Sequence, residues 1–425
     1  MTTAPQTVES DIASDCAAAK AAARALAAAP AEVKNRALDS IASGLIERAE
    51  SILEANAADL ADERAQGLSD ALIDRLSLDR SRVEAMAEGV KAVSALDDPI
   101  GEILEARTLE SGIELSKVRV PLGVVAVVYE ARPNVTIDCA VLTIKSGNAI
   151  LLRGSSYAER TNFALAEVVR DGLAQAGLPA DSVVLSTGGG RDQLAELATQ
   201  EGVIDLLIPR GGEGLKNVLK DVATVPVMYA ASGNCHVYVH TEADFEMARA
   251  ITVNAKVSRP GVCNAAETLL VDHAVAAEFL PATLVELRDA GVELVGDPLA
   301  IAASDGVEVA PAEKADWDTE FLDLKVAVGI VADLDAAIEH VNAHGSGHSE
   351  AIVTASEDAA ERFATEVDAA AVYINASTRF TDGFEYGMGA EIGNSTQKLH
   401  ARGPIGLREL TTFKYVGRGD GQIRA

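Results

Sequence analysis

Residues 121–129 read Pro-Leu-Gly-Val-Val-Ala-Val-Val-Tyr, a turn followed by a continuous apolar run. A run this short and apolar is typical of a strand in a sheet covered on both faces. Similar short runs follow, each ahead of a polar or glycine-rich turn and a segment with helical spacing, at 149–152, 183–185, 204–208 and 226–228. This alternation predicts an α/β fold of βαβ units around a mainly parallel sheet. We expect ligands at the carboxyl ends of its strands.

A second alternating block runs from 237 to 375. Its expected helices and strands lie at 243–256, 275–288, 326–331, 351–353 and 372–374. This pattern predicts a second α/β domain, and Cys263 falls inside it.

The segments outside these blocks differ in character. Residues 8–96 are alanine-rich with apolar residues at helical spacing, which predicts three helices, with Pro30 starting the second and Gly67 and Ser69 breaking the chain before the third. Residues 100–120 carry a hairpin signal around Ser111-Gly112. The glycine-rich segment from Ala376 suggests loops that wrap over a site or a partner subunit.

Composition excludes several classes of function. With 425 residues and 48% hydrophobic content, the chain can build two or three cored domains. Its formal net charge of −29 argues against a nucleic-acid or anionic-membrane surface, so a site for an anionic substrate must gather positive charge locally. The sequence shows neither a signal-peptide pattern nor an apolar run near the roughly 18 residues of a membrane span. We therefore expect an acidic cytoplasmic protein.

The cysteines favour the same compartment. They lie far apart and form no CxxC pair, at Cys16, Cys139, Cys235 and Cys263. This spacing indicates neither a disulfide framework nor a thiolate zinc site, and free thiols fit a reducing compartment.

One cysteine lies in a context that suits catalysis. Residues 258–268 read Ser-Arg-Pro-Gly-Val-Cys-Asn-Ala-Ala-Glu-Thr, which places Cys263 after a Pro-Gly turn and before the apolar run 269–271. A thiol at such a turn can face a cleft while the flanking segments fix its position, as covalent catalysis by a thiolate requires. Cysteines are also often simply buried, so spacing alone leaves a structural role open.

Glycine-rich turns follow several expected strands. They read Arg-Gly-Ser-Ser at 153–156, Ser-Thr-Gly-Gly-Gly at 186–190 and Pro-Arg-Gly-Gly-Glu-Gly at 209–214. Glycines let backbone N–H groups and helix N-termini approach a phosphate closely. None of these turns is GxGxxG or a Walker P-loop, so each alone also fits a plain connection. Together, at successive strand ends, they favour a nucleotide site.

Several longer stretches carry a family resemblance. Residues 120–124 lead to Tyr-Glu-Ala-Arg-Pro-Asn at 129–134, Cys263 lies in the stretch 259–268, His-Gly-Ser-Gly-His-Ser-Glu occupies 344–350, and His-Ala-Arg-Gly-Pro occupies 400–404. Along nearly its whole length the chain resembles the gamma-glutamyl phosphate reductases, also called glutamate-5-semialdehyde dehydrogenases. They are a proline-biosynthesis family of the aldehyde dehydrogenase superfamily.

The resemblance implies an aldehyde-dehydrogenase-like α/β fold with two Rossmann-like parallel-sheet domains and a small β oligomerisation element. Residues 1–99 and 121–240 would form the NADP-binding domain, and 241–375 the catalytic domain with its nucleophilic cysteine. The hairpin 100–120 and the tail 376–425 would form the oligomerisation element. A homo-oligomer is the implied assembly, and a contact with the upstream glutamate kinase is a further implied partner.

The implied reaction is the NADPH-dependent reduction of L-glutamyl 5-phosphate to glutamate 5-semialdehyde with release of phosphate. Cys263 would attack the acyl phosphate to form a thioester. Asn134 matches the superfamily's oxyanion-hole asparagine, with the backbone N–H of Cys263 as second donor, although Asn134 could also cap a helix at 135–145. Aldehyde-oxidising relatives keep a water-activating glutamate where this chain has Ala231-Ser232-Gly233. That absence favours reduction over hydrolysis of the thioester.

The resemblance also assigns binding residues. Arg153 and Ser156 stand where NAD-using relatives have a lysine and often a ribose-binding glutamate, which favours NADPH because both residues donate to a 2′-phosphate. The implied cofactor-binding residues are Arg153, Ser155, Ser156, Gly188, Gly211 and Glu320, the last on the nicotinamide ribose. The candidates for the substrate carboxylate and phosphate are Arg132, Arg259 and Arg379, with Ser377 and Thr378 as hydroxyl donors.

Two other patterns give weaker indications of function. His340, His344 and His348 are four residues apart, but glycines interrupt that stretch and the chemistry needs no metal, so we expect no metal site. Cys235 and His236 are neighbours on an expected strand, where successive side chains point to opposite faces, so they form no catalytic pair. Two rival functions remain: an acylating aldehyde dehydrogenase that uses another activated acid, and a non-catalytic nucleotide-binding descendant of the fold.

Overall fold

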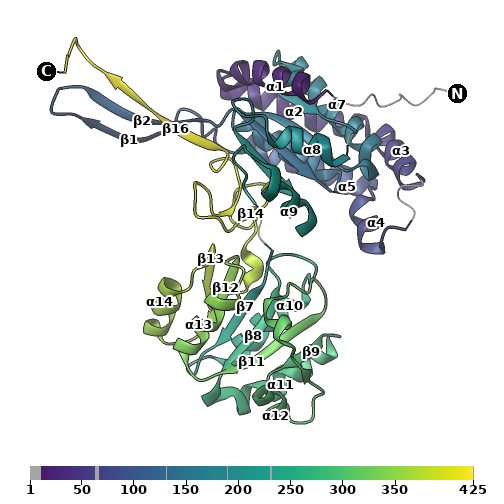
Figure 1. Ribbon diagram of the computed structural model, residues 1–425, viewed down its shortest axis with the longest axis vertical. Coiled ribbons are helices and arrows are strands. Elements are labelled where there is room, and N and C mark those ends of the chain that lie inside the picture. The colour runs from purple at the N-terminus through teal and green to yellow at the C-terminus, as the bar shows by residue number, and fades with distance from the viewer. Residues whose placement is uncertain (1–10, 63–66, 131, 189, 230–231, 425) are drawn as a thin grey trace. The chain divides into compact units, whose positions relative to one another are not determined.

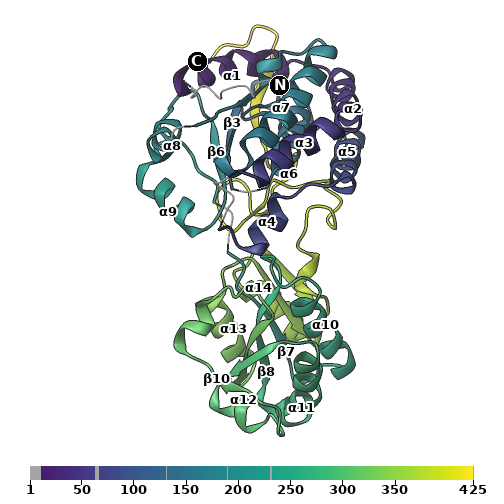
Figure 2. The same ribbon diagram turned by 90° about the vertical axis from the view of Figure 1, so that its right-hand side faces the viewer.

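The computed structural model describes residues 11–62, 67–130, 132–188, 190–229 and 232–424 (Figure 1 and Figure 2). Contacts divide the chain into two compact units. The first comprises Met1–Tyr229, Gly387–Gly393 and Ile405–Ala425, and the second Ala230–Tyr386 and Asn394–Pro404. No helix in the described part of the chain is long and apolar enough to cross a membrane.

The described N-terminal part forms five helices where the sequence predicted three: α1 (Ile12–Ala27), α2 (Ala31–Glu47), α3 (Ala49–Leu60), α4 (Asp70–Leu76) and α5 (Arg80–Ala95). Two breaks lie where expected, with Pro30 at the N-cap of α2 and the Ser69 hydroxyl accepting from Leu72 N before α4. The extra breaks lie at Arg48 and at Asp79, whose carboxylate caps α5. Apolar spacing continues across both of these breaks, so it did not reveal them.

The first unit is built on the parallel sheet of β3 (Val124–Tyr129), β4 (Ala149–Gly154), β5 (Val183–Leu185) and β6 (Leu206–Arg210). Its connecting helices are α6 (Asn134–Lys145), α7 (Glu159–Gln175) and α8 (Gly190–Ala198), and α9 (Glu213–Val222) follows β6. The expected run at 226–228 makes only a bridge between Val227 and Leu207. The strand order is β5-β4-β3-β6, so the chain steps outward from β3 and then returns to its other side. The carboxyl ends of β3 and β6 form the switch point at which such sheets bind ligands.

The predicted hairpin is confirmed and gains a partner from the far end of the chain. Strands β1 (Ile103–Thr108) and β2 (Glu114–Pro121) are antiparallel, and β16 (Thr411–Arg418) pairs with the other edge of β2. Figure 1 shows the three strands extending together as an arm. Phe413 and Tyr415 on β16 are 45% and 58% exposed.

The second unit is built on a larger parallel sheet in the order β10-β9-β11-β8-β7-β12-β13. Its strands are β7 (Cys235–Val239), β8 (Ala266–Asp272), β9 (Glu293–Gly296), β10 (Ala310–Pro311), β11 (Lys325–Val331), β12 (Ser349–Val353) and β13 (Ala371–Ile374). A short antiparallel ladder, β14 (Asn394–Ser395) and β15 (Gly403–Pro404), belongs to the same unit.

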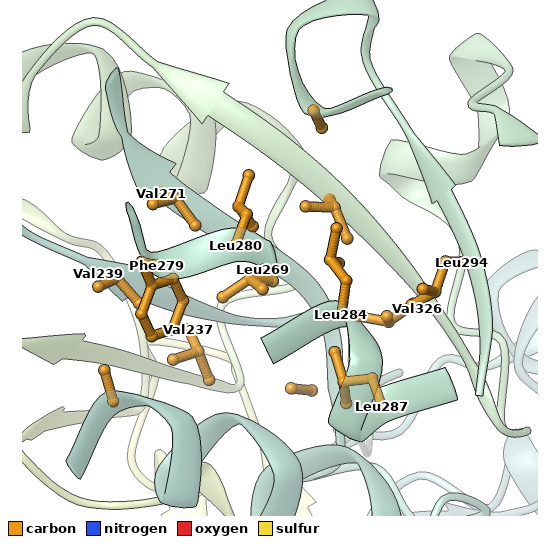
Figure 3. Packing of buried hydrophobic residues seen from close by; sticks show 14 of the residues in the cluster. Val237, Val239, Leu269, Val271, Phe279, Leu280, Leu284, Leu287, Leu294 and Val326 are labelled. Carbon is orange, nitrogen blue, oxygen red and sulfur yellow. The ribbon is translucent and has the colours of Figure 1, made fainter. Parts of the chain in front are cut away.

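Helices cover both faces of this sheet. On one face, α10 (Phe245–Val257), α11 (His273–Asp289) and α12 (Pro298–Ala302) enclose the core of Figure 3, where Phe279 and Leu280 pack with Val237. On the other, α13 (Leu334–His344) and α14 (Glu357–Glu366) pack over Tyr238. Consecutive residues of β7 therefore face opposite cores, as the strand period requires.

The predicted fold class, two parallel-sheet α/β units with a small antiparallel element, is confirmed. The units divide at Tyr229, because β7 pairs with β8 and β12 and so belongs to the second sheet rather than to the predicted segment 121–240. Within the tail, 387–393 and 405–425 pack with the first unit. The roles expected of these segments in cofactor binding, catalysis and oligomerisation stay predictions.

Candidate active site

Cys263 lies in a tight loop between α10 and β8. Helix α10 ends at Val257, and the Ala265 N–H donates to the Val262 carbonyl at 3.1 Å, which closes a turn around the cysteine. The side chain is half-buried, whereas Cys16, Cys139 and Cys235 are buried. The predicted nucleophile is therefore the most accessible thiol of the chain, and it precedes β8 at the amino end of that strand.

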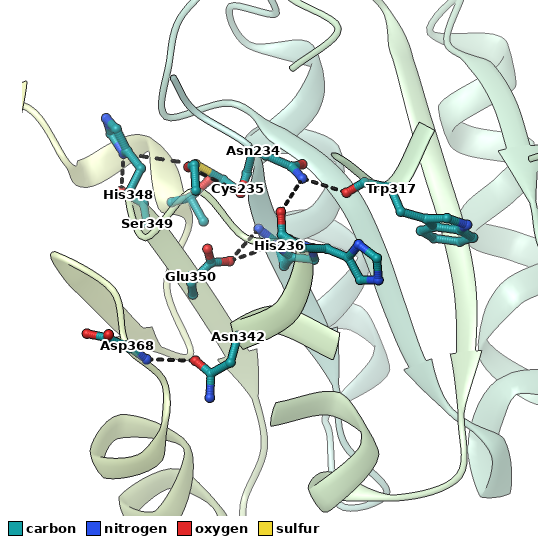
Figure 4. Close-up of polar contacts among 12 residues, drawn as sticks. Asn234, Cys235, His236, Trp317, Asn342, His348, Ser349, Glu350 and Asp368 are labelled. Atoms are coloured by element: carbon teal, nitrogen blue, oxygen red, sulfur yellow. Dashed lines mark hydrogen bonds and ion pairs between the residues drawn. The ribbon is translucent and has the colours of Figure 1, made fainter. Parts of the chain in front are cut away.

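The backbone of Cys263 is held from the β7 side. A Cβ atom on Gly233 would lie 1.6 Å from the Cys263 carbonyl oxygen, so only glycine allows this approach. The Cys235 thiol donates to the same oxygen at 3.2 Å. Figure 4 shows Cys235 beside His348 and His236 turned toward Glu350. The two neighbouring side chains therefore have different partners, Cys235 the Cys263 carbonyl and His236 the Glu350 carboxylate.

Asn264 anchors the loop from the other side. Its side-chain amide donates to the carbonyls of Arg379 and Thr381 at 3.2 and 2.9 Å, and its own carbonyl accepts from the Thr378 hydroxyl at 2.7 Å. The 3-10 turn η5 (Thr378–Phe380), which Ser377 caps by accepting from Arg379 N, thus packs on the cysteine loop. The hydroxyl of Thr378, predicted as a substrate donor, bonds within the protein.

Positive charge gathers at this loop, as an anionic substrate requires. Arg379 donates from Nε to the Ser258 hydroxyl at 3.1 Å and also bonds to the Asn264 side chain. Burial lowers the pKa of Arg379, the charge of Arg259 lowers it further, and Asp382 and Cys263 oppose the change. The predicted residues Arg259, Arg379 and Cys263 are therefore within electrostatic reach of one another.

Glu320 is tied to the same framework. Its Oε1 accepts from the Gly233 N–H at 2.8 Å. The loop behind it is held by the buried pair of Lys256 and Glu267, which are 2.6 Å apart: Lys256 Nζ donates to the Asp323 carbonyl, and Glu267 accepts from Leu322 N. Burial raises the pKa of Glu267, and the charge of Lys256 opposes that rise.

Asn134 occupies the first turn of α6 in the first unit. The N-cap position belongs to Pro133, so the alternative that Asn134 caps this helix is wrong. Its exposed side chain donates instead to Asp138 Oδ2 at 2.9 Å, one helical turn later. Burial raises the pKa of Asp138 to about 6, while the bond from Asn134 and the charge of Arg210 oppose the rise.

Four of the predicted cofactor residues, Arg153, Ser155, Ser156 and Gly188, lie at or just after the carboxyl ends of β4 and β5. Arg153 donates to the carbonyls of Gly188 and Gly190 at 3.1 and 2.7 Å, and burial lowers its pKa. Ser156 is exposed, whereas the Ser155 hydroxyl oxygen is buried with no hydrogen-bond partner among the described residues. A ligand hydroxyl or phosphate at these strand ends would complete such a donor set.

Gly211 follows β6 and packs on Glu130, which follows β3. A Cβ on Gly211 would lie 2.8 Å from the Glu130 carboxyl carbon, and the Gly212 N–H donates to Glu130 Oε2 at 3.1 Å. Arg132 is half-buried, and its carbonyl accepts from Val135 N at the start of α6. These residues lie at the ends of β3 and β6, the switch point of the sheet.

The histidines of 340–348 are held by different partners, although the rings of His340 and His344 lie 4.6 Å apart. His344 Nδ1 bonds to Asp318 at 2.8 Å, and His348 Nδ1 bonds to the Ser349 hydroxyl at 2.7 Å. Burial lowers the pKa of His340 to about 3. Among the described residues no group of three or more histidine, cysteine, aspartate or glutamate side chains could hold a metal ion.

Sequence reasoning missed the residues that position the candidates. They are Asp138 under Asn134, Gly233 and Cys235 against Cys263, and Asn264 against the 377–381 turn. The spacing of Asn134 and Asp138, four residues apart on an expected helix, could have revealed the first. The contacts of Gly233 with Cys263 and Glu320 join segments that lie far apart in the sequence, so they leave no local signal. Ala231, where the water-activating glutamate is missing, lies outside the described residues.

Comparison with known proteins places the chain. The aldehyde dehydrogenase family model matches residues 1–313 and 326–416. The gamma-glutamyl phosphate reductase of Heliobacterium modesticaldum is 52% identical over 394 residues, which cover 93% of this chain and 94% of that protein. The crystal structure of gamma-glutamyl phosphate reductase from Thermotoga maritima superposes with a TM-score of 0.95 at 44% identity and covers 98% of this chain and 100% of that one.

A more distant structure shares the fold alone. It is a glyceraldehyde-3-phosphate dehydrogenase from Methanocaldococcus jannaschii complexed with NADP, at 17% identity and a TM-score of 0.68, covering 98% of this chain and 96% of that one. The family match and the two closer relatives extend over nearly the whole sequence. The chain therefore belongs to the aldehyde dehydrogenase family and, within it, to the gamma-glutamyl phosphate reductases.

Proposed function

We propose that this protein reduces L-glutamyl 5-phosphate to L-glutamate 5-semialdehyde with release of phosphate, in proline biosynthesis. The observation that carries the proposal is the 52% identity to a gamma-glutamyl phosphate reductase along 93% of the chain. The half-buried Cys263 and the two guanidinium groups near it supply the chemistry that this reaction needs.

Cys263 is the proposed nucleophile. Its thiolate attacks the carbonyl carbon of the acyl phosphate, the bond from that carbon to the phosphate oxygen breaks, and a thioester remains on the sulfur. Arg259 and Arg379 favour the thiolate and attract the anionic substrate. Arg132, Ser377 and Thr378 complete the proposed substrate contacts. Because the net charge is −29, this local positive charge has to overcome a repulsive field.

The tetrahedral oxyanion needs donors that are already in place. We assign the Asn134 amide and the Cys263 backbone N–H to this task. Asp138 accepts one Asn134 N–H, which fixes the rotation of the amide and leaves the second N–H for the substrate. The clamp on the Cys263 carbonyl by Gly233 and Cys235 fixes the adjoining peptide in the same way.

The family uses a nicotinamide cofactor, and the residues present fit one. We propose that Arg153, Ser155, Ser156, Gly188 and Gly211 hold its adenosine and phosphates and that Glu320 holds its nicotinamide ribose. The unpartnered buried hydroxyl of Ser155 supports this assignment. When bound in its reduced form, the cofactor supplies the hydride that turns the thioester carbonyl into the aldehyde.

The decisive experiment is the reverse reaction, NADP⁺ reduction by glutamate semialdehyde with and without inorganic phosphate. We expect turnover only with phosphate, because Ala231 stands where a water-activating glutamate would be and hydrolysis of the thioester lacks a base. Rapid oxidation of the semialdehyde to glutamate without phosphate would contradict the proposal.

Replacing Asp138 with asparagine tests the oxyanion assignment. Because the pKa of Asp138 is about 6 and the protonated acid accepts more weakly from Asn134, we expect kcat of the parent protein to fall as the pH drops through 6. In Asp138→Asn this limb should disappear from the pH profile of kcat. An unchanged limb in the variant would show that another group titrates.

The same residue gives a stability signature. The pKa of Asp138 is raised on folding, so the native state binds the extra proton between about pH 4 and pH 6, and the free energy of unfolding falls as the pH rises through that window. Asp138→Asn should flatten this slope in urea titrations at pH 4.5 and 6.5. Equal slopes would mean that Asp138 is not the group responsible.

The cofactor preference follows from Arg153 and Ser156. No carboxylate stands among the residues assigned to the adenosine ribose, so a 2′-phosphate meets donors there. We expect kcat/KM for NADPH to exceed that for NADH by at least tenfold. Comparable values for the two cofactors in steady-state assays would contradict the assignment.

The remaining partners are proposals of the same kind. We propose a homo-oligomer through the arm of β1, β2 and β16, whose exposed aromatic side chains Phe413 and Tyr415 offer an apolar contact. All four cysteines are free thiols, which fits a reducing, cytoplasmic compartment. A contact with glutamate kinase stays a prediction from the resemblance.

A further inference from the structure

A cavity of about 490 Å³ lies within the second unit, beside the amino end of β12. Its polar lining includes Asn342, Ser346, Glu350, Asp368, Lys398 and Arg402. The volume is in the range of small-molecule sites. The polar groups come from α13 and the loop after it, from β12, from the segment after α14 and from the loop between β14 and β15. None of these residues belongs to the site proposed for catalysis.

Two residues that line this cavity each hold a buried side-chain atom without a hydrogen-bond partner among the described residues. Glu350 is 1% exposed, and its Oε2 accepts from the backbone N–H and from Nδ1 of His236 at 2.7 and 3.0 Å (Figure 4). Its Oε1 has no hydrogen-bond partner among the described residues, and neither has the buried Nε of Arg402. A buried polar group without a partner is destabilising, so an acceptor and a donor left unpaired on two lining residues of one cavity indicate a missing ligand.

The positive and negative charges of the lining lie in different parts of the cavity. Arg402 bonds to Asp368 at 2.8 Å, and Lys398 bonds to the same carboxylate. Two cations sharing one carboxylate leave a surplus positive charge at this part of the cavity. Glu350 supplies a carboxyl group elsewhere in the lining, and burial raises its pKa, so it gains from a cationic partner.

Strand β7 separates the cavity from Cys263. The Cys235 side chain leaves one face of the strand and donates to the Cys263 carbonyl. The next residue, His236, leaves the other face and bonds to Glu350, which lines the cavity. A molecule in this cavity therefore lies across β7 from the nucleophile, and its occupant is distinct from the acyl group on sulfur.

We propose that this cavity binds the zwitterionic end of a free α-amino acid. The ammonium group donates to Glu350 Oε1, and the carboxylate accepts from Arg402 and Lys398. A simple anion would pair with Arg402 and Lys398 but would leave Glu350 unpaired. A simple amine would pair with Glu350 but would leave the two cations without an added acceptor. A zwitterion satisfies both unpaired atoms and both charges, which is why it fits better than either.

Isothermal titration calorimetry on the full chain tests the proposal, with L-glutamate as the probe and glutarate, which lacks the ammonium group, as its match. We expect L-glutamate to bind at least tenfold more tightly than glutarate. Arg402→Ala should weaken L-glutamate binding at least tenfold. The control Arg362→Ala, which removes a guanidinium from a surface ion pair on α14, should leave it unchanged.

Arg379→Ala shows whether L-glutamate binds in this cavity or at the proposed substrate loop. L-glutamate binding that survives Arg379→Ala and fails in Arg402→Ala supports the cavity. Binding that fails in Arg379→Ala and survives in Arg402→Ala places the amino acid at the catalytic loop and overturns the inference. Equal affinity for L-glutamate and glutarate, or no binding of either, overturns it as well.

Hydrogen exchange on the parent protein gives a measurement that needs no variant. Saturating L-glutamate should slow amide exchange at 345–350 and 396–402, two of the segments that line the cavity. Unchanged exchange in both segments, with L-glutamate bound, would place the ligand elsewhere and overturn the proposal.

Discussion

Replacing Cys263 with alanine is expected to lower phosphate-dependent NADP⁺ reduction by at least about 10⁴-fold. The alanine cannot form a thioester, and the described loop holds no second thiol that is accessible, because Cys235 is buried and bonded to the Cys263 carbonyl. Binding should persist, since Arg259, Arg379 and the proposed cofactor residues are untouched. The measurement is the initial rate with glutamate semialdehyde and phosphate, together with a titration of NADPH fluorescence.

Cys16→Ala is the matched control. Cys16 is a buried thiol on α1 in the first unit, so the variant makes the same chemical change away from the proposed chemistry. Its rate should stay within about threefold of the parent protein. If Cys263→Ala kept more than a tenth of the parent activity, the covalent mechanism would be wrong. If the parent protein itself showed no turnover, the result would favour the alternative of a non-catalytic nucleotide-binding protein.

Gly233→Ala is expected to lower kcat by about 10²-fold and to destabilise the protein by about 1–3 kcal/mol. The new Cβ would lie 1.6 Å from the Cys263 carbonyl oxygen and 2.3 Å from the carbonyl carbon. These are backbone atoms, so the strain cannot be relieved by turning a side chain. Either the cysteine loop or the segment that bonds to Glu320 has to move.

A second glycine-to-alanine variant shows whether the loss of activity in Gly233→Ala comes from the contact with Cys263. In Gly89→Ala, on α5, the added methyl group meets nothing within 4 Å, so this control should keep its activity and gain slightly in stability. The two variants are compared by kcat, by thermal melting and by the rate at which an alkylating reagent modifies Cys263. Parent-like alkylation and kcat in Gly233→Ala would show that the contact does not position the nucleophile.

The local parts of this fold could be predicted from the sequence. The run 124–129 and the apolar runs that follow it form strands between polar turns, and the turn residues Ser111-Gly112 predict the hairpin. The helix count was wrong because Arg48 and Asp79 end and begin helices inside continuous apolar spacing. Such breaks depend on single residues, which periodicity averages away.

In the candidate site too, the residues in local motifs could be predicted from the sequence and those with distant partners could not. Cys263 and Asn134 stand in short motifs, so their candidacy could be recognised from sequence. Gly233 and Asn264 act through partners at large sequence distance, and a glycine or an asparagine has no local pattern that reveals such a contact. What positions the chemistry is long-range packing, which only the folded chain displays.

The pairing of β16 with β2 imposes an order on folding. Residues 114–121 find their first partner in β1 nearby, but their second edge waits for 411–418, which are synthesised much later. Until then β2 presents an unpaired edge, the kind of surface at which nascent chains pair with the wrong neighbour. The arm can therefore close only after the whole second unit, which precedes β16 in the chain, has been synthesised.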